Sequence, residues 1–147
     1  MNYIKNFPRD GLAHRKDMPQ FDDAADVKKL DKAVRRLGKT VKNRAIDPNK
    51  LRPMQRYVSY KKAKEIDPTL PGNRILVSED GGIIDGHHRW AAAHWRKCKG
   101  KLSKNFRVKT REYEMNAADL LKLAQKISFK RHKTFRKNIL KLCGHKH

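Results

Sequence analysis

The stretch that decides the fold runs from residue 73 to residue 99 and reads NRILVSEDGGIIDGHHRWAAAHWRKCK. Residues 74–78 are mostly apolar and β-branched, which is typical of a buried strand. Residues 79–82 have the Asp-Gly composition of a tight turn, and a second short strand follows over 82–85. A helix is expected over 86–97. The stretch therefore predicts a β-hairpin that leads through a glycine directly into a helix.

Further helices and a strand are expected on either side of this unit. Apolar residues recur at three- and four-residue spacing from Val27 to Leu37, and Gly38 is placed to end that helix. Residues 106–110 alternate apolar and basic side chains like a half-buried strand, and Asn116 is placed to cap a helix with one apolar face. These patterns predict a small α/β domain of the α+β kind, with a short mixed sheet flanked by helices.

The segment between the first helix and the hairpin has weaker signals. Residues 39–41 suit a short extended piece, and the turn residues at 46–49 end it. Residues 51–59 are expected to form an irregular extended loop because Pro53 restricts the residue before it. Ser59 then caps a short helix over 61–65.

The ends of the chain differ in composition from the middle. Residues 1–20 mix prolines, glycine and charges without a period, which indicates a basic N-terminal arm. The folded domain is expected over 21–128. Residues 129–147 hold seven Lys and Arg and no carboxylate, which indicates a basic C-terminal tail or a last helix.

The charge balance points to a polyanionic partner. The 147 residues include 37 Lys and Arg against 15 Asp and Glu, a formal net charge of +22. So much like charge on a small body repels itself unless phosphates or counterions neutralise it. No apolar run approaches the roughly 20 residues that span a bilayer, and the N-terminus lacks the apolar core of a signal peptide. We therefore expect a cytoplasmic protein that binds nucleic acid, and no membrane.

The turn between the second strand and the helix has the chemistry of a phosphate site. Free backbone N–H groups point outward at a helix start, and the helix dipole there favours negative charge. Gly86 has no Cβ to obstruct a phosphate, and His87, His88 and Arg89 add side-chain donors. Asp85 is placed to orient a histidine, hold a metal ion or accept a proton. On spacing alone, the same residues would also suit an ordinary turn with histidines that cap the helix.

Residues 75–77 and the run Gly82 to Ala92, preceded by Asp47-Pro48 and by 51–56, resemble the ParB/sulfiredoxin superfamily in its phage and plasmid ParB-like nuclease branch. The resemblance covers about residues 39–127. It implies a sulfiredoxin-like fold in which the Gly86–Arg89 turn holds nucleotide phosphates, as in ParB proteins and a related free-serine kinase.

The same resemblance implies that Gln55 and Arg56 close the pocket over the turn. In sulfiredoxins the position of His87 is the catalytic cysteine, so sulfinic-acid reduction is not expected here. Chromosome-partition ParB proteins carry further domains for which 147 residues leave no room, so a partition clamp is not expected either.

The leading prediction is a DNA-binding ParB-like phage protein that hydrolyses phosphodiesters with a divalent metal, without strong sequence preference. Asp85, His87 and His88 are the candidate catalytic residues, and Asp85 is the candidate ligand of Mg²⁺ or Mn²⁺. Gly86, Arg89, Gln55 and Arg56 complete the candidate phosphate site. If the protein is phage-encoded, it is expected in the host bacterial cytoplasm.

Two alternatives remain open at this point. One is an NTPase or phosphotransferase that binds ATP or CTP with the same turn. The other is a non-catalytic phage protein that binds DNA or inhibits a host protein partner.

A second set of residues is predicted to follow a nucleic-acid backbone. Between His87 and Arg111 the chain is rich in Lys and Arg and has no acidic residue, whereas ordinary surfaces mix both signs. The expected backbone contacts are Arg96, Lys97, Lys99, Lys101, Lys104, Arg107, Lys130, Arg131, Lys133, Arg136 and Lys137. Trp90 is expected to pack the helix on the sheet rather than to stack on a base.

Overall fold

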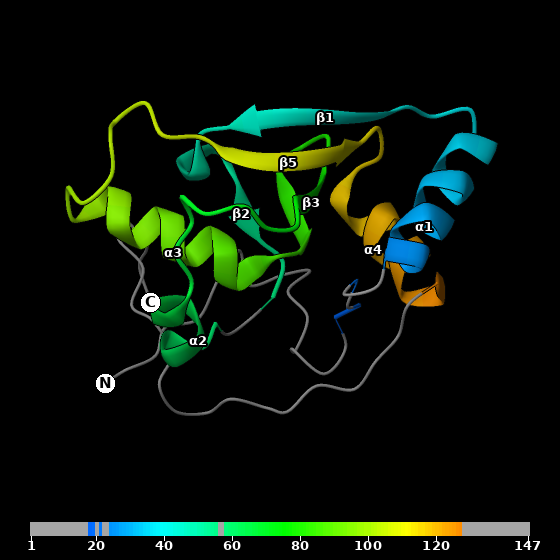
Figure 1. Ribbon diagram of the computed structural model, residues 1–147. Coiled ribbons are helices and arrows are strands. Elements are labelled where there is room, and N and C mark those ends of the chain that lie inside the picture. The colour runs from blue at the N-terminus through cyan, green and yellow to red at the C-terminus, as the bar shows by residue number, and fades with distance from the viewer. Residues whose placement is uncertain (1–17, 20, 22–23, 56–57, 128–147) are drawn as a thin grey trace.

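A five-stranded mixed sheet with helices on both faces forms the core of the molecule (Figure 1). The computed structural model describes residues 18, 19, 21, 24–55 and 58–127. The elements in chain order are α1 (Ala24–Arg36), β1 (Val41–Ile46), the 3₁₀ turn η2 (Pro48–Lys50), β2 (Arg52–Pro53), α2 (Tyr60–Glu65), β3 (Ile75–Ser78), β4 (Gly82–Asp85), α3 (His87–Cys98), β5 (Val108–Tyr113) and α4 (Ala117–Ile127). The predicted α/β class, with a short mixed sheet flanked by helices, is confirmed.

The strand order is β1-β5-β3-β4-β2. The pairs β1–β5 and β3–β4 are antiparallel, whereas β3–β5 and β2–β4 are parallel. The predicted hairpin and helix are confirmed as β3, β4 and α3, which place the end of β4 directly before the start of α3.

Alternate residues of the central strands face two separate cores. Ile75 and Val77 of β3 pack with Trp90 of α3, whereas Leu76 between them packs with Leu30 of α1 and Leu120 of α4. This alternation follows from the period of two in a strand. The sheet therefore separates α2 and α3 from α1 and α4, as Figure 1 shows.

Two strands extend further than the sequence predicts. β1 runs to Ile46, whereas only 39–41 is expected to be extended, and β5 covers 108–113 rather than 106–110. β1 is an edge strand, and its inner residues 42–45 are exposed, so it lacks the apolar alternation that marks a half-buried strand. Pairing with β5 along its whole length defines it instead.

Most of the predicted arm (1–20) and the tail (129–147) lie outside the described residues. Met18 and Pro19 are described and buried, and Met18 packs with Phe21 in the core between the sheet, α1 and α4. Among the described residues, every helix is too short or too polar to cross a membrane.

Candidate functional site

Gly86 allows α3 to begin directly at the end of β4. It adopts a left-handed conformation with φ of +96° and forms the N-cap of α3 without a side-chain capping bond. A Cβ at this position would lie 3.2–3.4 Å from Ile75 and would meet backbone strain as well. The first turn of α3 can therefore lie against β3 only with glycine here.

His87 anchors the segment before α2 to the start of α3. Its side chain is buried, and its Nε2 accepts hydrogen bonds from the backbone N–H of Met54 at 3.0 Å and of Gln55 at 3.1 Å. A ring nitrogen that accepts carries no proton, so the neutral ring holds its proton on Nδ1. The lone pair of Nε2 is thus used for structure, and this nitrogen is not placed to act as a base.

His88 makes the corresponding contact one step further along the chain. Its Nε2 accepts from the backbone N–H of Ser59 at 3.1 Å. Ser59 is the N-cap of α2, and its Oγ accepts from the backbone N–H of Lys62 at 3.3 Å, as the sequence predicts. His88 therefore fixes where α2 begins relative to α3.

Arg89 is held by the loop that connects α2 to β3. Its Nη2 donates to the carbonyl oxygens of Pro68 and Leu70. Gly72 lies against the guanidinium, because a Cβ there would be 2.4 Å from Nη1. Nη1 and Nε have no hydrogen-bond acceptor among the described residues. The loop thus orients the guanidinium and leaves part of its donor set for a ligand.

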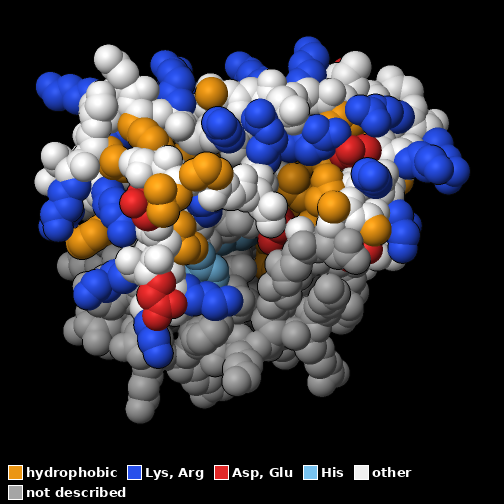
Figure 2. All heavy atoms as spheres, in the orientation of Figure 1, with side chains coloured by type: hydrophobic (Ala, Val, Ile, Leu, Met, Phe, Trp, Pro, Cys, Tyr) orange, Lys and Arg blue, Asp and Glu red, His pale blue; other side chains and the backbone are white. Residues whose placement is uncertain are grey.

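These residues meet at one cavity of about 390 Å³. The predicted site residues that line it are Gln55, Asp85, Gly86, His87, His88 and Arg89. Figure 2 shows histidine side chains in a hollow below the centre of the face in view. The structure therefore brings the helix-start turn and Gln55 together, although Gln55 and His87 are 32 positions apart in the chain. The predicted pocket residue Arg56 lies outside the described part of the chain.

Further residues, outside the predicted site, also line the cavity. They are Met18, Pro19, Lys62, Glu65, Ile66, Asn73, Arg74 and Ile84. Lys62 and Glu65 come from α2, three residues apart on one helix. The sequence offers one indication that Lys62 and Glu65 belong to the site. The resemblance places the segment around Gln55 at the pocket, and α2 follows that segment directly.

Two carboxylates, Asp85 and Glu65, line the cavity. Asp85 Oδ2 accepts from the backbone N–H of Phe21 at 3.4 Å. In the part of the chain that the structure describes, no three His, Cys, Asp or Glu side chains gather in a way that could hold a metal ion. The metal assigned to Asp85 stays a prediction. Two carboxylates fit an Mg²⁺ that reaches the site already bound to phosphates better than one held by protein ligands alone.

The other acidic residues of the hairpin lie apart from the cavity. Asp80 forms an ion pair of 2.7 Å with Arg52, and both side chains are well exposed. Glu79 and Asp80 are both exposed, as is usual at the tip of a hairpin.

The predicted backbone-contact residues differ in their surroundings. Lys97 forms an ion pair of 3.0 Å with Asp47, and its side chain is only 11% exposed. Arg96 donates to the carbonyl oxygens of Ala92 and Lys64, and Lys101 lies over the Trp95 ring. Lys99, Lys104 and Arg107 are exposed. Lys130, Arg131, Lys133, Arg136 and Lys137 lie outside the described residues.

Trp90 packs as predicted. It is fully buried, and its Nε1 donates to the carbonyl oxygen of Pro48 at 2.7 Å. Its ring stacks on His94, whose Nδ1 lies 2.8 Å from Asn49 Oδ1. These contacts attach η2 to α3 and hold the chain that leads to Gln55.

Similarity to known proteins adds no assignment to this cavity. Neither protein-family models, nor curated proteins, nor solved structures give a match to the chain. The likeness to the ParB/sulfiredoxin superfamily rests on the sequence motifs alone.

Proposed function

We propose that the chain is a ParB/sulfiredoxin-type nucleotide-binding protein that hydrolyses or transfers a phosphoryl group of ATP or CTP in the cavity at the start of α3. One observation carries the proposal. The Gly86–Arg89 turn and Gln55, which are separate in sequence, line the same cavity. Its volume of about 390 Å³ falls within the range of small-ligand sites, roughly 300–1,000 Å³.

The start of α3 supplies the phosphate-binding groups. The positive end of the helix dipole faces the cavity wall formed by Gly86 and His87. Arg89 adds N–H donors from Nη1 and Nε, while its Nη2 stays bound to the loop. A guanidinium with planar, fixed donors suits a phosphate better than a mobile ammonium.

The two carboxylates of the cavity are the candidate ligands of a divalent metal ion. Asp85 and Glu65 would hold a divalent ion that accompanies the nucleotide, and such an ion neutralises negative charge on the phosphates during transfer. Asp85 is also the candidate base for the attacking water or hydroxyl. His87 and His88 position the walls of the site, since their Nε2 atoms accept backbone hydrogen bonds.

The test is titration of a fluorescent ATP or CTP analogue with Mg²⁺. We expect saturable binding by the wild type and a loss of about tenfold or more in affinity for Arg89→Ala, because charge-assisted hydrogen bonds to phosphate disappear. Arg52→Ala is the matched control: it removes an exposed arginine that pairs with Asp80 outside the cavity. Equal binding by wild type and Arg89→Ala would exclude this site, and thermal unfolding checks that both variants are folded.

A DNA nuclease is the second candidate, and the exposed Lys99, Lys104 and Arg107 favour it because they extend a cationic surface beyond α3. It predicts cleavage of plasmid DNA with Mg²⁺ or Mn²⁺ that Asp85→Asn abolishes. DNA binding without turnover in either metal would favour the non-catalytic alternative instead.

A further inference from the structure

The outer face of α1 carries four cations close together in the sequence. Lys28, Lys32, Arg35 and Arg36 are exposed, and among the described residues none of them forms an ion pair. By contrast, Lys29 lies 4.0 Å from Asp26. Like charges three and four residues apart destabilise a helix. This arrangement therefore has a cost in the isolated protein that a bound polyanion would remove.

The one carboxylate beside these cations is already neutralised. Asp31 is 7% exposed, and its Oδ1 accepts from Arg111 Nε at 3.0 Å and from Tyr113 Oη at 2.7 Å. Its Oδ2 forms an ion pair of 2.5 Å with Arg111 Nη2. Asp31 therefore attaches α1 to β5 and leaves little negative charge to oppose an anion.

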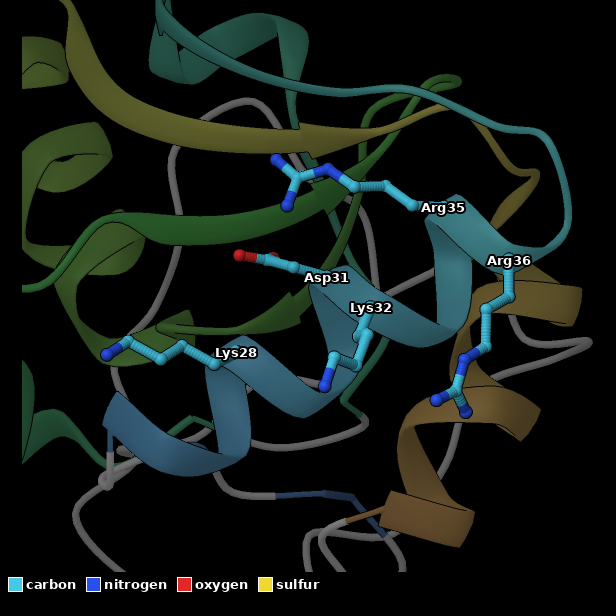
Figure 3. Close-up of a pocket in the computed structure, with 5 residues that line it drawn as sticks. All are labelled: Lys28, Asp31, Lys32, Arg35 and Arg36. Carbon is cyan, nitrogen blue, oxygen red and sulfur yellow. The ribbon is translucent and has the colours of Figure 1, made fainter.

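The four cations surround a shallow hollow of about 470 Å³. Figure 3 shows Lys28 and Arg35 extending from α1 on the same side as Asp31, while Lys32 and Arg36 leave the helix on another side. Figure 2 shows that Lys and Arg side chains also line the upper edge of this view, along which β1 runs in Figure 1. Lys39 and Lys42, at the end of the α1–β1 connection and in β1, are exposed. The cationic surface thus extends from α1 to the edge of the sheet.

We propose that this α1 surface, formed by Lys28, Lys32, Arg35 and Arg36, binds the sugar-phosphate backbone of a nucleic acid. An open hollow edged by flexible, exposed side chains suits an extended polyanion that is read by charge. It lacks the enclosed, oriented donors that a single small anion would need. The surface lies on the opposite face of the sheet from α3, so the inference goes beyond the nucleotide cavity and does not depend on it.

The experiment measures fluorescence anisotropy of a short labelled duplex DNA with the full chain over a series of KCl concentrations. The α1 variant replaces Lys28, Lys32, Arg35 and Arg36 by Gln. The control replaces the exposed Lys50, Lys61, Lys64 and Lys109 by Gln, which removes the same charge outside both the α1 surface and the predicted backbone contacts. For the α1 variant we expect an affinity loss of about tenfold or more and a salt slope smaller by about 3 to 4. In the control variant, both the affinity and the salt slope should change much less.

Equal losses in the two variants would overturn the proposal, because net charge alone would then explain binding. Equal competition by polyglutamate and by unlabelled DNA would also overturn it. Parallel titrations with single-stranded DNA and with RNA identify which phosphate backbone is preferred. The α1 variant should bind the fluorescent nucleotide as the wild type does. If the wild type binds no nucleotide but the DNA results hold, the cavity function fails and the α1 surface stands.

Discussion

At the scale of single residues, the Nε2 atoms of the two histidines of the turn act as hydrogen-bond acceptors. The sequence assigns them to phosphate binding or catalysis, since a histidine at a helix start can supply either. In the structure, Nε2 of His87 receives two backbone N–H groups and Nε2 of His88 receives one. An imidazole can do this only in its neutral form. They act as positioning residues that connect α3 to the Gln55 segment and to α2.

His87→Ala should therefore destabilise the protein more than His88→Ala. The first change leaves two buried N–H groups without an acceptor and creates a cavity, at a cost of about 3 kcal/mol in the free energy of unfolding. The second removes one partly buried bond and should cost about 1 kcal/mol. Urea denaturation measures both. Equal stabilities for the two variants would show that the hydrogen bonds from Met54 and Gln55 to His87 add nothing to the stability of the fold.

At the scale of elements, the loop between α2 and β3 is built to hold Arg89. Asp67 Oδ1 accepts from both the backbone N–H of Thr69, at 2.9 Å, and its hydroxyl, at 2.6 Å. These hydrogen bonds, that of the hydroxyl first, hold the pKa of Asp67 below its usual value. The turn so formed presents the carbonyl oxygens of Pro68 and Leu70 to the guanidinium.

Gly72→Ala should weaken nucleotide binding while it leaves stability nearly unchanged. The new Cβ would displace the Arg89 guanidinium, which can move because it is the end of a long side chain. We expect affinity for the fluorescent nucleotide to fall by about threefold to tenfold, as phosphate hydrogen bonds lose their alignment. Leu70→Ala is the control in the same loop, because that side chain is 58% exposed and only its carbonyl contacts Arg89. Unchanged affinity for Gly72→Ala would contradict the role given to Arg89.

Local patterns predict some elements well and others poorly. Apolar runs and Asp-Gly turn residues define β3, β4 and the start of α3, because each signal lies within a few residues. β1 is polar and is defined by its pairing with β5, so the sequence shows only a fragment of it. The loop at 67–72 and the placement of Glu65 and Asp85 at the same cavity depend on tertiary packing. That Gln55 lies near the Gly86–Arg89 turn could be predicted from the sequence only through the family resemblance.

At the scale of the whole molecule, positively charged groups lie on both sides of the sheet, at the start of α3 and on the outer face of α1. The cavity lies where β4 passes into α3, on elements that belong largely to the α2 and α3 side. The α1 surface lies in the other helical layer, which Asp31, Arg111 and Tyr113 connect to β5. A small domain can thus hold a nucleotide and a longer polyanion at separate places, provided that both layers remain attached to the sheet.

The attachment of the α1 layer should make stability depend on pH through Asp31. Burial by itself would raise the pKa of Asp31, but hydrogen bonds from Arg111 and Tyr113 hold it below its usual value of 3.8. A carboxyl group whose pKa is lower in the folded state stabilises the fold above its unfolded pKa, and this stabilisation is lost as the pH falls through the folded value. The wild type should therefore lose the contribution of Asp31 in acid.

Asp31→Asn removes that contribution at every pH. At neutral pH we expect it to lower the free energy of unfolding by about 2 kcal/mol, because Arg111 loses its charged acceptor. The difference from wild type should shrink as the pH falls from about 5 to about 2. Urea denaturation across this range measures it, with Asp26→Asn on the same helix as the control for loss of one negative charge. A difference that stays constant into acid would show that Asp31 acts through shape alone, and that the α1 layer is attached by its apolar core rather than by this ion pair.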